Sequence, residues 1–281
     1  MKRRILTANN LNDFQKYLIL QEKSKATTKK YFRDAKVFAD FAGNEEIRKE
    51  IVIAYKEHLR ENHAVRSVNS MLASINSLFA FLGWFDLKIK ALKVQHQVFC
   101  SEEKELTKAE YARLCKAAQS NHNERLNLIL QTICATGIRV SELRFITVEA
   151  VKQSEATVSL KGKTRSIFIV KDLKKKLLRY AAKQNIKSGM IFVTRTSKPI
   201  NRTNIWREMK NLCKKANVNP QKVFPHNLRH LFARVFYNIE KDIAKLADIL
   251  GHSSINTTRI YIISTGTEHR RRMEELSPQL K

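Results

Sequence analysis

The sequence predicts a mainly α protein of two domains, the second of which carries a small antiparallel β-sheet. Apolar residues recur at helical spacing through most of the 281 residues, and only one stretch alternates as strands do. A polar stretch over residues 93–104 interrupts the pattern and is expected to be a linker. At roughly 100–200 residues per domain, the length fits one domain at residues 1–92 and a second at residues 105–281.

The first domain is expected to be a compact set of four amphipathic helices. In the second of them Tyr31, Ala35 and Phe38 share one face, and Gly43 is a residue type that ends helices. Gly83 ends the fourth helix in the same way. The expected helices span residues 10–21, 24–42, 45–61 and 66–82.

The second domain should begin with a helix, because Thr107 and Glu110 have the spacing of a capping box. A further helix at residues 125–136 is ended by Gly137. Alternating residues on both sides of a glycine turn at residues 161–164 predict a β-hairpin. The expected strands span residues 157–160 and 166–170, and the expected later helices span residues 172–184, 201–216 and most of the remaining chain.

The charge balance points to a polyanionic partner. Lys and Arg number 53 against 26 Asp and Glu, which gives a net charge of +27. Such an excess suits DNA, RNA or a membrane surface, and charge alone does not separate them. A hydrophobic content of 43% excludes a disordered chain. No apolar run is long enough for a membrane span and no secretory signal opens the chain, so we expect a cytoplasmic protein.

Cysteine and histidine spacings give no support for a metal site. The four cysteines are Cys100, Cys115, Cys134 and Cys213. Their spacing fits no zinc motif, so free thiols in a reducing compartment are expected. His226 and His230 are four residues apart, as in some zinc peptidases, but no Glu follows the first His and no third ligand is evident. We therefore expect no metal.

Five short motifs follow one another in the second domain. Arg139 follows a helix-ending glycine, Lys163 stands in the hairpin, and His226 and Arg229 share one helix face. They are followed by Leu-Gly-His at residues 250–252 and by a Thr-Thr-Arg-Ile-Tyr segment at residues 257–261. Each motif alone is better explained by ordinary packing or a solvated side chain, so only their order and spacing indicate a function.

From residue 135 to residue 261 this ordered set resembles the tyrosine recombinase (phage integrase) family, and within it a compact, Xer-like member. The resemblance rests on TGIRVSEL, Gly-Lys in the hairpin, HNLRH, LGH and the following Tyr. Residues 24–38, with SKATT, Tyr31, Asp34 and Phe38, look like the family's helical core-binding domain. The resemblance implies a SAM-like N-terminal domain and a mainly α catalytic domain with a small antiparallel sheet.

The same resemblance implies an activity: cutting and rejoining DNA through a 3′-phosphotyrosine intermediate and a Holliday junction, without metal, nucleotide or other cofactor. Tyr261 would be the nucleophile, His226 the base and Lys163 the general acid that protonates the leaving 5′ oxygen. Developing negative charge on the phosphate must be met by fixed donors. The implied donors are Arg139, Arg229 and His252. Glu142 is expected to hold Arg139 or to cap the nearby backbone.

The partners implied are double-stranded DNA carrying a specific site, a homo-tetramer on two duplexes and accessory DNA-binding proteins, with no membrane and a place at the nucleoid. A tail at residues 267–280 is expected to pack on a neighbouring protomer. Basic, amide and hydroxyl side chains are the expected DNA contacts, most of them to phosphates. These are Lys25, Thr27, Lys29, Lys30, Arg66 and Asn69 in the first domain and Lys198, Asn201, Arg202, Asn204 and Arg207 in the second.

Two other functions remain open at this point. A type IB topoisomerase would use the same chemistry to relax supercoils, and a non-catalytic DNA-binding regulator would explain the charge but not the ordered set of reactive side chains. Within recombinases, the sequence leaves open resolution of plasmid or chromosome dimers and integration of a mobile element.

Overall fold

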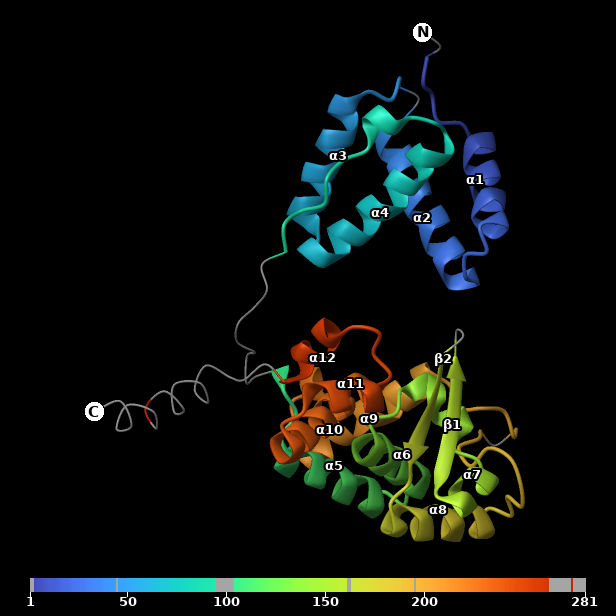
Figure 1. The fold of residues 1–281 in the computed structure, drawn as a ribbon, viewed down its shortest axis with the longest axis vertical. Helices are drawn as coiled ribbons and strands as arrows, with labels where there is room; N and C mark the ends of the chain where they lie inside the picture. The colour runs from blue at the N-terminus through green and yellow to red at the C-terminus, as the bar shows by residue number, and fades with distance from the viewer. Residues whose placement is uncertain are drawn as a thin grey trace. The chain divides into compact units, whose positions relative to one another are not determined.

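A computed structural model of the chain describes residues 3–43, 45–94, 104–160, 163–194, 196–262 and 274. The chain divides into two compact units, Met1–His96 and Gln97–Lys281 (Figure 1). No helix within the described ranges has the length and apolarity needed to span a bilayer. Most of the linker expected at residues 93–104, together with Cys100 and the tail at residues 267–280, lies outside the described residues, apart from Glu274.

The first unit is a helical domain. Its helices pack their aromatic and aliphatic faces into one core, in which Phe38 lies edge-on to both Tyr55 and Phe79. The segment after the last helix is held by Asn69 and Asn76, whose side chains bond to the backbone at Leu92 and Ile89. The elements are α1 (Ala8–Leu20), α2 (Lys25–Ala42), α3 (Lys49–Asn62), α4 (Val65–Phe81) and η1 (Phe85–Leu87).

One helix of this unit begins later than the sequence predicts. The expected start at residue 45 is wrong, because α3 begins at Lys49. Ile47, just before it, is fully buried, and its backbone N–H donates to the carbonyl of Arg4 at 2.7 Å. That long-range bond holds the preceding segment out of the helix, whereas helical spacing of apolar residues alone could not reveal it.

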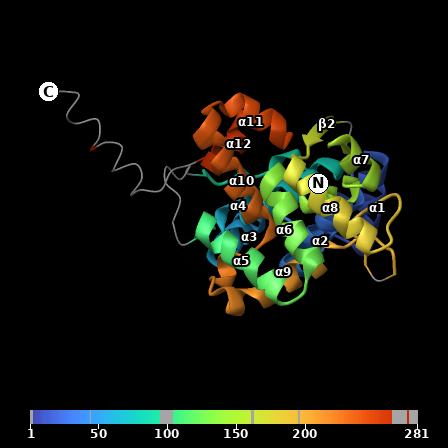
Figure 2. The same cartoon turned by 90° about the horizontal axis from the view of Figure 1, so that it is seen from below.

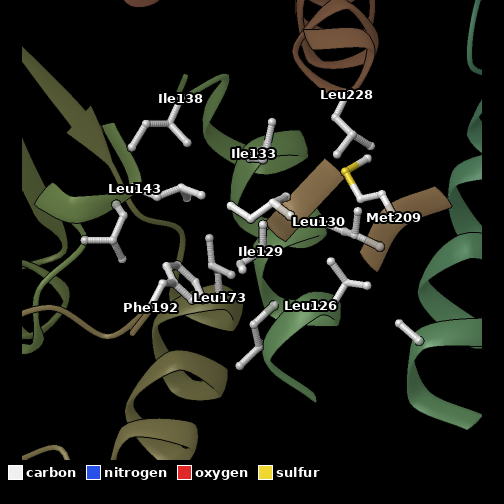
Figure 3. Packing of buried hydrophobic residues seen from close by; sticks show 14 of the residues in the cluster. Leu126, Ile129, Leu130, Ile133, Ile138, Leu143, Leu173, Phe192, Met209 and Leu228 are labelled. Atoms are coloured by element: carbon white, nitrogen blue, oxygen red, sulfur yellow. The ribbon is translucent and has the colours of Figure 1, made fainter. Parts of the chain in front are cut away.

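The second unit surrounds the buried helix α6 (Glu124–Thr136) with other helices. Leu126, Ile129, Leu130 and Ile133 face side chains of α8, α9 and α10, as Figure 3 shows. Because α6 is buried on nearly every side, it forms the centre of this unit. The other helices are α5 (Lys108–Ser120), α7 (Val148–Gln153), α8 (Lys171–Lys183), α9 (Arg202–Ala216), α10 (Pro225–Glu240), α11 (Ile243–Leu250) and α12 (Ile255–Ile262), with the short 3₁₀ segments η3 (Val140–Phe145) and η4 (Pro220–Lys222).

Strands β1 (Glu155–Leu160) and β2 (Lys163–Phe168) form an antiparallel hairpin, and Leu160 pairs with Lys163. Lys163 and Thr164 therefore belong to a strand rather than to the turn in which the sequence placed them. Arg165 and Ile167 are the inward positions of β2, and the alternating residues Thr164, Ser166 and Phe168 are exposed. Helix α11 contacts β2, and α11 and α12 lie together beside α10 (Figure 2).

The ends of several elements follow their sequence signals. Thr107 and Glu110 form the capping box that begins α5, and Gly137 ends α6 in a left-handed conformation. A β-carbon at Gly137 would lie 2.5 Å from the ring of Phe232, so no other residue fits there. The chain leaves this turn directly into Arg139, which starts η3. The mainly α fold with a small antiparallel sheet is confirmed.

Candidate active site

The predicted catalytic side chains come from five separate elements of the second unit. Arg139 caps η3, His226 and Arg229 lie in the first two turns of α10, His252 follows α11, and Tyr261 lies on α12. The structure brings these five side chains together. Lys163 begins β2, and its side chain lies outside the described part of the chain.

Helix α10 is fixed at its N-terminal end, where its functional residues are. Pro225 occupies the first helical position, which suits its restricted backbone. The side-chain amide of Asn227 donates to the carbonyls of Lys104 and Lys222, and Arg234 pairs with Glu105. These contacts tie α10 to two segments that precede it in the chain, so His226 and Arg229 are presented from a rigid support.

Arg229 is buried at the centre of the site and is only 1% exposed. Its guanidinium donates to the carbonyls of Gly137 and Leu250, which are the C-terminal ends of α6 and α11. Burial, followed by the charge of Arg139, lowers the pKa of Arg229 to about 10. Its Nε–H has no partner among the described residues. The site therefore holds a cation that an anion would stabilise.

Arg139 reaches the same region through Glu142. The Glu142 carboxylate accepts from the Arg139 backbone N–H and from its guanidinium, both at 2.8 Å, while Arg139 also donates to the Gly251 carbonyl at 3.3 Å. Glu142 thus does both things that the sequence suggested, holding the arginine and capping the backbone. The Arg139 side chain remains 40% exposed, so it can meet a ligand.

Arg165 completes this charge network, and the sequence analysis gave it no role. Its guanidinium donates to Glu142 at 2.6 Å and to the carbonyl of Ile249. Burial alone would raise the pKa of Glu142, but hydrogen bonds from Arg139 and the charge of Arg165 lower it overall. The carboxylate is therefore ionised, and Arg139, Arg165 and Arg229 together outnumber it by two positive charges.

Gly251 allows this packing. Its backbone is left-handed, and a β-carbon there would lie 2.5 Å from the Arg165 side chain. The chain then continues into His252, whose Nε2 lies 3.0 Å from Arg229 and whose Nδ1 lies 2.9 Å from Thr258. Burial, followed by the charge of Arg229, lowers the pKa of His252 to about 4, so the imidazole is neutral at pH 7.

Tyr261 lies inside the site of its own chain and is 5% exposed. Its hydroxyl is 3.2 Å from Nε2 of His226. Burial, followed by the charge of Arg229, lowers the pKa of His226. Neutral His226 has a lone pair, so it can accept the phenolic proton.

His230 supports the tyrosine ring. Its imidazole stacks on Tyr261, with ring centroids 4.1 Å apart, and meets His226 edge-on at 4.8 Å. Burial, followed by the charge of His226, lowers the pKa of His230 to about 3. A neutral ring stacked on the phenol gives His230 a packing role in the site. No group of His, Cys, Asp or Glu that could hold a metal occurs in the part of the chain the structure describes.

The predicted DNA contacts fall into two groups. Lys30 donates to Asp34, to Ser74 and to the carbonyl of Ser70, and both amide atoms of Asn69 bond to the backbone of Leu92. These two side chains hold the first unit together, so neither is carried forward as a DNA contact. The exposed ones are Lys25, Lys29 and Arg66 in the first unit and Lys198, Asn201, Arg202 and Arg207 in the second.

Two further predicted contacts are half-buried and take part in local bonds. The Thr27 backbone N–H and hydroxyl bond to Ser24, which caps α2. The Asn204 side chain accepts from Arg207, while the Asn204 backbone N–H donates to the side chain of Asn201, which caps α9. Both side chains lie at the N-terminal end of a helix, next to exposed basic residues.

Comparison with known proteins gives a consistent result. Residues 104–268 match the phage integrase family, and residues 11–84 match the phage integrase N-terminal SAM-like domain. The tyrosine recombinase XerA of Pyrococcus horikoshii is 30% identical over 95% of this chain and 93% of its own. The tyrosine recombinase XerD of Halalkalibacterium halodurans is 29% identical over 92% of this chain and 95% of its own.

Solved structures agree on the fold. A crystal structure of XerA recombinase, 25% identical, covers 97% of this chain and 99% of its own with a TM-score of 0.54. A lambda integrase dimer bound to a COC′ core site, 18% identical, covers 92% and 96% with a TM-score of 0.75. Since the family match spans more than half of the chain and relatives align over nearly all of it, the chain belongs to the phage integrase family of tyrosine site-specific recombinases.

Proposed function

We propose that the chain cuts and rejoins DNA at specific sites, with Tyr261 as the nucleophile. The observation that carries this is the 3.2 Å contact between the Tyr261 hydroxyl and His226. In the same site Arg139 is 40% exposed, and the Nε–H of Arg229 has no partner among the described residues. The phenol oxygen attacks a DNA phosphate and forms a 3′-phosphotyrosyl bond. The bond to the 5′ oxygen breaks, and that oxygen leaves as a 5′-hydroxyl.

Each proton in this step has an assigned place. His226 takes the proton of Tyr261 as the phenol attacks, because its lowered pKa keeps it neutral at pH 7. Lys163 gives a proton to the leaving 5′ oxygen. Sequence resemblance assigns this role, and the place of Lys163 next to the hairpin turn is compatible with it.

The phosphate's growing negative charge is met by fixed donors. Arg139, which is partly exposed, donates its free N–H groups to the phosphate oxygens. The buried Arg229 adds its positive charge from inside the site. His252 holds Arg229 in place through Nε2, and it can itself donate to a phosphate oxygen only in the tautomer that carries its proton on Nε2. These groups stay in place through the reaction, which is the condition under which such stabilisation is most effective.

Rejoining follows from the covalent intermediate. The phosphotyrosyl bond retains the free energy of the broken phosphodiester, so attack by a 5′-hydroxyl from a second duplex exchanges strands without ATP. Two rounds on a tetramer would pass through a Holliday junction. A lambda integrase tetramer bound to a Holliday junction and XerH bound to a palindromic difH substrate, both of this fold, support that scheme.

DNA would be held by both units. The exposed lysines and arginines at the starts of α2, α4 and α9 are proposed phosphate contacts, and Asn201, Asn204 and Arg207 are proposed base contacts. Thr27 is also a proposed phosphate contact. The place of action would be the nucleoid in the cytoplasm. The biological outcome would be either resolution of a plasmid or chromosome dimer or integration of a mobile element. Accessory DNA-binding proteins would be further partners.

Strand exchange between two labelled duplexes tests this function. Duplexes carrying the target sequence are recovered by trapping covalent adducts from a random-sequence library. With two such duplexes of unequal length, we expect recombinant strands and a Holliday junction on native gels. Relaxation of supercoiled plasmid without any exchanged strand would instead favour a topoisomerase, and sequence-specific binding without any adduct would favour a regulator.

A further inference from the structure

A cavity adjoins the proposed phosphate-binding arginines on the side of α9. It has a volume of about 670 Å³, and its lining includes Arg139, Arg202, Trp206, Phe224, His226 and Arg229. Half of these residues form the catalytic group itself. A DNA strand whose phosphate lies on Arg139 and Arg229 would therefore place a neighbouring nucleoside in or beside this cavity. The volume is within the range of about 300–1,000 Å³ that is usual for small-ligand sites.

Trp206 is the unusual member of this lining. It is 47% exposed, although tryptophan normally buries its large ring, and the other tryptophan, Trp84, packs against the core of the first unit. The sequence analysis gave Trp206 no role. An indole left open beside two catalytic arginines is a surface that a flat or apolar ligand would cover.

Positive charge surrounds the indole. Arg202, Trp206 and Lys210 are spaced four residues apart, so they share one face of α9. The Lys210 ammonium lies 5.3 Å from the centre of the indole ring. Arg202 is exposed and lines the same cavity. This face is therefore both aromatic and cationic.

The two parts of the cavity suit the two parts of a nucleotide. Arg139, Arg202 and Arg229 attract phosphate, while Trp206 and Phe224 offer apolar ring surface. A free anion would use only the cations. A nucleoside joined to the bound phosphate would use both, because aromatic side chains pack against bases and sugars irrespective of sequence.

We propose that this cavity binds the nucleoside adjoining the scissile phosphate and that Trp206 packs against it. The inference rests on the proposed function, since it needs a DNA phosphate on the arginines. Trp206 would fix the position of the strand relative to Tyr261. It would contribute to the rate of cleavage at every site that the enzyme accepts.

The test measures single-turnover cleavage of nicked duplexes that carry the sequence recovered by covalent trapping. The nucleotide on either side of the scissile phosphate is replaced in turn by a tetrahydrofuran abasic unit or by a three-carbon spacer. The abasic unit removes the base, and the spacer removes base and sugar ring. Wild type is compared with Trp206→Ala and Trp206→Phe. Phe168→Ala is the matched control, because Phe168 is an exposed aromatic residue of the same unit that does not line the cavity.

On the intact duplex, Trp206→Ala should slow cleavage by about 5- to 150-fold, the range expected for the loss of one stacking contact. Trp206→Phe should retain most of the rate, and Phe168→Ala should leave it unchanged. On one spacer duplex the effect of Trp206→Ala should disappear, because the partner of the indole is already missing. Disappearance on the abasic duplex as well identifies the base as the partner, and disappearance on the spacer alone identifies the sugar.

An equal effect of Trp206→Ala on intact and spacer duplexes, at both flanking positions, would overturn the inference. So would an unchanged rate on the intact duplex. If the wild-type chain forms no adduct with any duplex, the proposed function itself fails and this inference falls with it, so the two failures are distinguishable.

Discussion

The Nη2 atom of Arg229 lies 3.0 Å from Nε2 of His252. Arginine can only donate, so Nε2 of His252 must accept, and the imidazole proton is on Nδ1. That proton is donated to the hydroxyl of Thr258, 2.9 Å away, and Thr258 is fully buried. One arginine and one threonine thus set the tautomer and orientation of the histidine before DNA binds.

This relationship predicts the effect of changing Thr258. Thr258→Val keeps the shape but leaves Nδ1–H of His252 without its acceptor, which costs about 1–3 kcal/mol for a buried donor. We expect covalent cleavage to slow by about 5- to 150-fold, in proportion to that cost. Thr258→Ser keeps the hydroxyl and should retain most activity. Single-turnover cleavage of a nicked duplex measures both, and equal rates for the two variants would show that the hydroxyl has no such role.

Glu142→Gln should impair both activity and stability. The buried carboxylate is shared by Arg139 and Arg165, so its loss leaves three arginines close together without an anion. Breaking a buried ion pair from one side costs about 3–5 kcal/mol. We expect a lower midpoint of thermal unfolding and slower cleavage.

The control for that variant is Glu240→Gln, which removes the acidic partner of Lys245 in a solvent-accessible pair of the same unit. Such surface pairs contribute about 0–1 kcal/mol, so the control should behave as wild type. Thermal unfolding and single-turnover cleavage are compared for both. If Glu142→Gln matched its control in both measurements, the network around Glu142 would contribute neither to stability nor to the rate of cleavage.

Lys163→Ala should slow cleavage of a normal phosphodiester. A 5′-bridging sulfur in place of the leaving oxygen needs no proton, so the cleavage rate of Lys163→Ala should be restored on that substrate. Lys161→Ala serves as the comparison, because Lys161 is the other lysine of the Lys-Gly-Lys segment. Rescue by sulfur in the Lys161 variant rather than the Lys163 variant would transfer the general-acid role to Lys161.

The active-site histidines predict how stability depends on pH. The pKa of His230 is lowered to about 3 and that of His252 to about 4, both mainly by burial, whereas a histidine in the unfolded chain has a pKa of about 6.5. The unfolded state therefore binds more protons between about pH 4 and 6.5. The free energy of unfolding should fall as the pH falls through that window, by roughly 1.4 kcal/mol per pH unit for each such histidine.

Urea unfolding followed by Trp206 fluorescence in a Trp84→Phe background reports on the second unit alone. His230→Gln should flatten the pH dependence by about one proton, whereas His63→Gln, at an exposed position of the first unit, should not change it. An unchanged slope in His230→Gln would mean that this imidazole is already protonated in the native state.

The sequence predicted the parts of the fold that depend on local signals. The capping box at Thr107 and the helix-ending Gly137 lie where expected. The predictions were wrong where a contact with a distant part of the backbone sets the end of an element. The start of α3 is an example, because the backbone N–H of Ile47 donates to the carbonyl of Arg4. The β-hairpin itself was predicted, but Lys163 and Thr164 were wrongly placed in its turn, although they pair with β1.

The candidate site shows the same division. Arg139, Arg229 and Tyr261 could be found because their motifs are short and ordered along the chain. Arg165 was missed, since its partners Glu142 and Ile249 are far from it in sequence and nothing in its neighbours marks it. The sequence could not separate Lys30 and Asn69 from true surface residues either, because their bonding partners are brought to them only by folding.

The central claim is that the hydroxyl of Tyr261 becomes esterified to DNA. Tyr261→Phe removes that oxygen and leaves the ring stacked on His230, so the fold and the DNA affinity should be retained. On nicked duplexes carrying the trapped sequence, denaturing gels should show a covalent adduct for wild type and none for Tyr261→Phe, with equal binding on native gels. A covalent adduct formed by Tyr261→Phe would contradict the account, because another residue would then have to be the nucleophile.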